Sequence, residues 1–265
     1  MPVQHSRIVT LLLVLLFAGI TASSLPSLSP PQVHPNQRHS REIEAEVVRW
    51  SRQLKSAGQE ERIEAALNLG HLEGSAATSA LASALSDRSP LVRAVVLAGL
   101  ANRTDASAAP LIAGRLTADK DPFVRKAAAY ALSRYAGPER TAALIAALKD
   151  KDLEVRGAAA VSLADHPDVT AIEALVIALS DKAGFVRAQA AHALGINAGA
   201  ASGAAPHLIK LLTSDNEGDV RRQAAVALGL IGDRSALPAL EAVRHDGNSY
   251  LAQAARDAIR MIERQ

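Results

Sequence analysis

An internal repeat with a period near 31 residues is the feature that most constrains how this chain can fold. Five copies share an acidic turn, a Val-Arg pair, two or three small residues, and Ala-Leu or Leu-Gly. Their arginines follow one another at intervals of 32, 31, 31 and 34 residues, at Arg93, Arg125, Arg156, Arg187 and Arg221. Degenerate copies at 60–70 and 250–259 make seven units. Such a period indicates a solenoid, in which each unit buries its apolar side against its neighbours.

Each unit contains two helical stretches. The second begins at the Val-Arg pair and places apolar residues on one helix face, as with Val124, Ala128 and Leu132. The first is shorter and lies upstream, for example at 141–148. Gly-Pro and Gly-Asp pairs stand at joints between units, where helices should stop. The pattern predicts an all-α fold, a right-handed α-solenoid of about seven helix pairs over residues 41–265.

The repeated pattern D-x(3–5)-VR-x(2)-AA-x-AL(G) resembles the HEAT-like repeat first described in phycobilisome lyases. The resemblance covers about 41–265 and implies stacked helix pairs whose second helices line a concave side. It implies no particular activity, because this repeat occurs in many unrelated proteins and a fold does not fix a function.

Composition agrees with a repeat and excludes several functions. Hydrophobic residues make up 49 % of the chain but aromatics only 3 %, which suits thin helical layers built from Ala and Leu. The net charge of +2 gives no broad basic field, so we expect no nucleic-acid partner. The chain contains no cysteine, which excludes disulfides, thiolate metal sites and a lipid anchor on cysteine.

The N-terminal region has the layout of an export signal. Residues 1–24 carry Arg7, then the uncharged apolar stretch 8–22, then small residues, which predicts a signal peptide or, if uncleaved, an N-terminal membrane anchor. Residues 25–40 contain four prolines and are expected to form an extended linker. The repeats would therefore be periplasmic, secreted, or tethered to a membrane.

The repeated charged residues are expected to hold the units together. A side chain that recurs in nearly every unit serves what every unit needs, which is stacking. Each aspartate should accept backbone N–H groups at a helix start and pair with an arginine of its own or the next unit. We call this set the ladder: Arg93, Arg125, Arg156, Arg187, Arg221, Asp119, Asp150 and Asp181.

Positions that vary between units are better candidates for partner binding. The residues one and five places after the ladder arginine share an outward face of the second helix. Most are small or apolar, where a merely solvated face would carry Lys, Glu and Gln. They predict a shallow groove for a protein segment, although tight helix packing would explain small residues equally well. The candidate contact residues are Lys126, Tyr130, Val161, His192, Arg222 and Val226.

No constellation of catalytic residues is found. HEAT-repeat di-iron hydroxylases use His-Glu pairs, and none of the eight histidines here is followed by Glu. The glycines at 195–205 lack the Lys-Ser/Thr of a phosphate loop. We therefore expect a non-catalytic scaffold or adaptor without metal or cofactor. A phycobilisome-lyase-like or chaperone-like role is the first alternative, and an oxidoreductase by family resemblance is the second.

Overall fold

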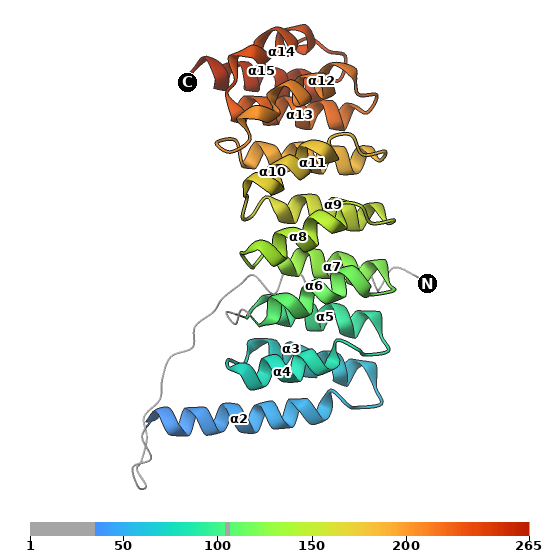
Figure 1. Ribbon diagram of the computed structural model, residues 1–265, viewed down its shortest axis with the longest axis vertical. Coiled ribbons are helices and arrows are strands. Elements are labelled where there is room, and N and C mark those ends of the chain that lie inside the picture. Colours follow the sequence, from blue (N-terminus) through green and yellow to red (C-terminus); the bar gives the residue numbers. More distant parts are fainter. Residues whose placement is uncertain (1–34, 104–106, 265) are drawn as a thin grey trace. The chain divides into compact units, whose positions relative to one another are not determined.

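The computed structural model describes residues 35–103 and 107–264 of the chain. Its contacts separate residues 1–40 from residues 41–265, and the first of these units enters the described part only through the start of helix α2. Every regular element in the described residues is a helix, as Figure 1 shows. The predicted all-α solenoid is confirmed.

Within the described residues the helices form seven consecutive pairs, as the repeat predicts. The first helices of the pairs are α2 (Pro35–Gln53), α4 (Ser75–Ala84), α6 (Ala108–Ala118), α8 (Pro138–Ala147), α10 (Val169–Ala178), α12 (Ala205–Ser214) and α14 (Leu237–Val243). The second helices are α3 (Gln59–His71), α5 (Pro90–Ala101), α7 (Pro122–Leu132), α9 (Leu153–Leu163), α11 (Gly184–Ile196), α13 (Gly218–Ile231) and α15 (Ser249–Glu263). Short 3-10 turns, Ser202–Ala204 and Arg234–Ala236, precede α12 and α14.

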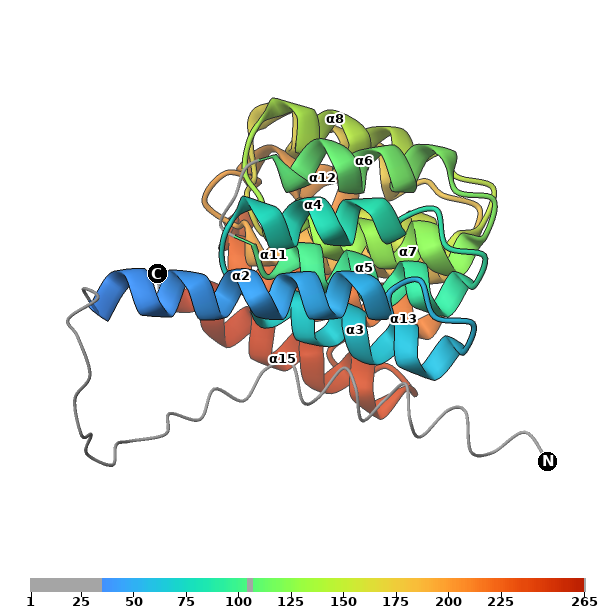
Figure 2. The ribbon, with the colours of Figure 1, turned by 90° about the horizontal axis from the view of Figure 1, so that it is seen from below.

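Within residues 41–265 the second helices pack against one another in sequence, from α3 to α15. The first helices lie on the other side of this layer, as α4, α6 and α8 do in Figure 2. One leucine per unit, seven residues after the ladder arginine or Arg62, fills the space between the layers. It is fully buried in six successive units: Leu69, Leu100, Leu132, Leu163, Leu194 and Leu228. Alanines occupy much of the rest of the contact, which explains how the described core packs with only two aromatic side chains, Trp50 and Tyr135.

Glycines allow the second helices to approach closely near their C-terminal ends. A Cβ added to Gly70 of α3 would lie 2.9 Å from Cα of Gly99 in α5. At the other end of the stack, a Cβ on Gly229 of α13 would lie 2.7 Å from Cα of Ala258 in α15. Both distances are shorter than real Cβ contacts, so these positions require glycine for packing rather than for backbone conformation.

The N-terminal prediction needs one correction. Residues 35–40 were expected to belong to an extended linker, but α2 begins at Pro35. Proline is tolerated in the first helical turn because its missing N–H would have no helical partner there. The predicted signal or anchor at 1–24 and the linker residues 25–34 lie outside the described residues. No helix in the described part combines the length and apolar character needed to cross a bilayer.

The glycine contacts can be tested with two matched substitutions. Gly229→Ala should lower the free energy of unfolding by about 1–3 kcal/mol, because the new methyl group meets backbone that cannot yield. Gly114→Ala, at a helical position with open space around it, should raise it by about 0.5–1 kcal/mol. Chemical denaturation of both variants measures the two changes, and equal shifts in the same direction would contradict the close approach.

Candidate functional site

The ladder consists of bidentate ion pairs between neighbouring units. Arg125 of α7 binds Asp150, with Nε 2.7 Å from Oδ2 and Nη2 2.8 Å from Oδ1. Its remaining nitrogen, Nη1, donates to the backbone carbonyl of Asp119 at 3.0 Å. The guanidinium therefore joins the turn of its own unit to the turn of the next. The same two-pronged pairing occurs in Arg62–Asp87, Arg93–Asp119, Arg156–Asp181 and Arg187–Asp215.

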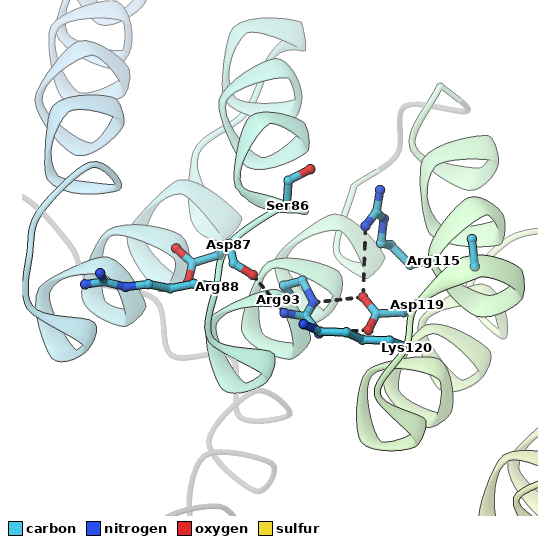
Figure 3. Close-up of a pocket in the computed structure, with 8 residues that line it drawn as sticks. Ser86, Asp87, Arg88, Arg93, Arg115, Asp119 and Lys120 are labelled. Carbon is cyan, nitrogen blue, oxygen red and sulfur yellow. Dashed lines mark hydrogen bonds and ion pairs between the residues drawn. The ribbon is translucent and has the colours of Figure 1, made fainter.

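The direction of the pairing corrects the sequence-based expectation. Each aspartate was expected to pair with the arginine of its own or the next unit, but its carboxylate binds the arginine of the preceding unit, as Arg93 and Asp119 show in Figure 3. The arginine of the same unit reaches only the aspartate's carbonyl oxygen. The long arginine side chain reaches from its own unit to the next, whereas the short aspartate side chain does not.

Ladder aspartates also shape the turn before each second helix. Oδ1 of Asp150 accepts the backbone N–H of Asp152 at 2.9 Å, and Asp152 in turn caps α9 by accepting from Glu154 and Val155. Burial opposes ionisation of Asp150. The hydrogen bonds from Arg125 and Asp152, together with the charge of Arg125, outweigh burial and lower the pKa of Asp150. The same balance lowers the pKa of the other ladder aspartates, Asp119 and Asp181, and of Asp87 and Asp215.

The ladder weakens toward the C-terminal end. The Arg93 and Asp119 side chains are 4 % and 2 % exposed, whereas those of Arg221 and Asp246 are 24 % and 23 % exposed. Arg221 makes one contact with the Asp246 carboxylate, at 3.1 Å. Ala252 stands at the equivalent position in α15.

The predicted contact residues lie on one surface, which we call the second-helix face. Tyr130 and His192 are exposed, whereas Val161 and Val226 are half-buried. Lys126 forms an ion pair with Glu154 of the next unit, with Nζ 3.5 Å from Oε2. Burial raises the pKa of Tyr130, and the negative charge of Glu154 raises it further. Glu154 therefore interacts with two of the candidates, Lys126 and Tyr130. Figure 2 shows the side of the stack on which the second helices lie.

Arg222 is held on its own helix. Its Nε donates to Oδ1 of Asp219 at 3.0 Å, one turn earlier in α13. The guanidinium remains partly exposed, at 35 % of the side chain. It therefore contributes a charged group to the second-helix face without joining units.

Several residues of this face were missed by sequence reasoning. Phe123, Phe185 and Tyr250 occupy one repeat position, two residues before the ladder arginine or Ala252, and all three are exposed. The face also continues one turn beyond His192 and Val226, to the exposed Ile196 and Leu230. The signal was available in the sequence, because helical spacing of three and four residues extends the two predicted positions in both directions.

Small residues on this face serve packing, the alternative left open by the sequence. Ala94 and Ala188 are buried. A Cβ on Gly157 would lie 2.3 Å from Cε1 of Phe185, so the aromatic ring of one unit covers the glycine of the unit before. Small residues thus seat the larger side chains that remain accessible.

Comparison with known families identifies the repeat. A model of HEAT repeats matches residues 49–133, 131–195 and 186–260, which is most of the chain. The chain belongs to the HEAT repeat family. No curated protein sequence matches it.

Solved HEAT-like structures resemble the chain at low sequence identity. The YibA protein of Escherichia coli is 23 % identical, with a TM-score of 0.59 over 86 % of this chain and 84 % of YibA. An engineered protein is 25 % identical, with a TM-score of 0.50 over 86 % of this chain and 71 % of its own. The complex of CpcE and CpcF of phycocyanin lyase from Nostoc sp. PCC7120 is 22 % identical, with a TM-score of 0.48 over 58 % and 99 %. The first two likenesses show the fold, and neither carries an activity across.

A second set of contacts joins these HEAT repeats where the second helices end. The fully buried Arg140 donates to the carbonyl oxygens of Leu132, Ser162 and His166, at the ends of α7 and α9. Burial lowers the pKa of Arg140, and the partial negative charge of helix C-terminal carbonyls stabilises its cation. Other side chains bind carbonyls of the preceding unit in the same region: Arg103, Tyr135 and Asn197.

The described part of this HEAT repeat chain contains no group of three or more His, Asp or Glu side chains placed to hold a metal ion. Among the histidines, His192 lies on the second-helix face, His71 is the last residue of α3, and His166 lies between α9 and α10. These three histidines belong to different units and do not form one site.

Ladder strength can be tested by comparing a central and a terminal arginine. Arg125→Ala should lower the free energy of unfolding by about 3–5 kcal/mol, because it leaves the mostly buried Asp150 carboxylate without its partner. Arg221→Ala should cost about 1 kcal/mol or less, because that pair is more exposed. Urea denaturation followed by circular dichroism gives both values. Similar losses of unfolding free energy in the two variants would show that the geometry of the ion pair does not determine how much each arginine stabilises the fold.

The lowered pKa values predict acid sensitivity. The pKa of each ladder carboxyl group is lower in the folded protein than in the unfolded chain, where it is about 3.8. Such a group stabilises the fold fully when the pH is above the unfolded pKa, and this stabilisation is lost as the pH falls through the folded pKa. The melting temperature should therefore drop steeply below about pH 4. Asp150→Asn should be less stable at neutral pH and should lose less stability on acidification. The exposed Glu173→Gln on α10 serves as a control and should follow the wild-type curve.

Proposed function

We propose that this HEAT repeat chain is a non-catalytic scaffold that binds a protein segment along its second-helix face. The observation that carries the proposal is the distribution of aromatic side chains. Six aromatics fall within the described residues, of which Trp50 and Tyr135 are buried. The other four are exposed, and all belong to the second-helix face: Phe123, Tyr130, Phe185 and Tyr250.

Aromatic side chains on a surface favour protein contact. They are enriched at the centres of protein interfaces, where they bury a large area at little cost in side-chain entropy. A core that packs with Ala and Leu has no need of them, and their exposure on one face is not required by the fold. Charged groups stand between them: the Lys126–Glu154 pair and the Arg222–Asp219 pair. Such a mixed face suits an amphipathic protein segment rather than a small molecule.

The proposed place of action rests on the sequence. The apolar stretch 8–22 behind Arg7 supports export from the cytoplasm, either as a free protein after cleavage or tethered through an uncleaved anchor. The partner would then be an envelope or secreted protein. The near-balanced charge of the chain favours a protein over a nucleic acid.

Substitution of the two exposed candidates tests the binding face. The double variant Tyr130→Ala, His192→Ala should retain the wild-type melting temperature within a few degrees and lose most of its captured partner in pull-downs from the envelope fraction. Ile177→Ala, at an exposed position on the first helix α10, is the matched control and should capture the partner normally. A large loss of melting temperature with unchanged capture would assign Tyr130 and His192 to packing instead.

A further inference from the structure

A row of basic side chains follows Asp87 and the ladder aspartates on the edge of the stack where the second helices begin. In four successive units the residue directly after the aspartate is basic and exposed: Arg88, Lys120, Lys151 and Lys182. We call these four residues the basic row. They share one repeat position, so the solenoid sets them at regular intervals, one per unit.

The ladder prevents the neighbouring aspartates from neutralising this row. The Asp119 carboxylate accepts two hydrogen bonds from Arg93 and one from the N–H of Asp121, so its charge is already matched. The same holds for Asp150, bound by Arg125 and the N–H of Asp152. Within the described residues no ion pair engages any member of the basic row, and Arg88 donates only to the carbonyl of Ala57.

Other charged groups on this edge leave it positive through the fifth unit. Arg115 and Lys149 add two cations near the row. The nearby acids are the helix caps Asp121 and Asp152, and Glu154, which is paired with Lys126. In the sixth unit the pattern ends, because Asn216 follows the aspartate and the acidic Glu217 comes next. These differences confine the row to four units.

An open cleft lies between the first two members of the row. Ser86, Arg88, Arg115 and Lys120 line it together with the ladder pair of Arg93 and Asp119, and its volume is about 320 Å³. Figure 3 shows Ser86 and Arg88 on the turn of one unit and Lys120 on the turn of the next, with Arg115 projecting from α6. Nη1 of Arg115 lies 4.0 Å from the Asp119 carboxylate, which already binds Arg93 closely, so its guanidinium can still donate hydrogen bonds to another anion.

The interval between units specifies the ligand. Packed neighbouring helices lie about 8–10 Å apart. An extended segment in the polyproline II conformation rises about 3.1 Å per residue and has three residues per turn, so one unit corresponds to three residues, and every third side chain faces the row. We propose that the basic row binds an extended acidic protein segment with Asp or Glu at every third residue, its carboxylates meeting Arg88, Lys120, Lys151 and Lys182 in turn. This surface uses residues different from the second-helix face and does not depend on the proposed function of that face.

A synthetic peptide pair tests the proposal with the full chain. One fluorescent peptide carries four aspartates, one at every third residue among Gly and Ser. The other has the same composition with its four aspartates adjacent. The periodic peptide should bind more tightly than the clustered one, and its affinity should fall as salt is raised, because exposed charges are screened.

Charge substitutions assign the binding to the row. Lys120→Gln and Lys151→Gln should each weaken the periodic peptide about two- to fivefold, as expected for one exposed ion pair. The double charge reversal Lys120→Glu, Lys151→Glu should weaken it at least tenfold. Lys210→Glu on α12 is the control and should leave binding unchanged, as should the Tyr130→Ala, His192→Ala variant. Circular dichroism confirms that each variant is folded.

Three outcomes would overturn the proposal: equal binding of both peptides, binding that persists in the folded double reversal, or tighter binding of a single-stranded oligonucleotide than of the periodic peptide. The last would assign the row to nucleic acid. Loss of the envelope partner by the Tyr130/His192 variant, without loss of the acidic peptide, would show that the two surfaces act separately.

Discussion

From α3 to α13, each second helix is joined to the next by an arginine whose guanidinium binds its own turn through one nitrogen and the following unit's carboxylate through two others. Arg125 shows the arrangement, with Asp119 behind it and Asp150 ahead. A buried pair of this kind adds little net stability over an apolar contact, because desolvation offsets most of the attraction. Its geometry is demanding, however, and one contact per unit sets how each unit meets its neighbour. Apolar burial by leucine and alanine then supplies the stability.

The surfaces follow from this contact. Because the arginine of the preceding unit binds each aspartate, the lysine or arginine that follows the aspartate forms no ion pair among the described residues at this edge of the stack. Because glycine and alanine allow the second helices to approach closely, the core needs no bulky rings, and the aromatic residues of the second helices stand on the surface. Helix packing and the ladder therefore leave two sets of side chains exposed: aromatic ones on the second-helix face and basic ones at the turns.

Sequence periodicity was enough to predict the seven helix pairs. A solenoid unit buries its apolar side only against the units next to it, and the same apolar pattern occurs seven times in the sequence. It also identified Tyr130 and His192 as outward-facing, since helical spacing fixes direction around the axis. It failed at the start of α2, where Pro35 begins a helix instead of extending a linker, because proline has the same local chemistry in both settings.

What the sequence determined by itself was the repeat, its helices and the identity of the ladder residues, all of which depend on contacts between residues close in the chain or in equivalent positions. The tertiary structure decided which unit each ladder aspartate binds, that Phe185 covers Gly157, and that Arg140 is buried among helix-end carbonyls. These facts depend on how far a side chain reaches between layers. That distance is set by the packing of whole helices, and no local pattern records it.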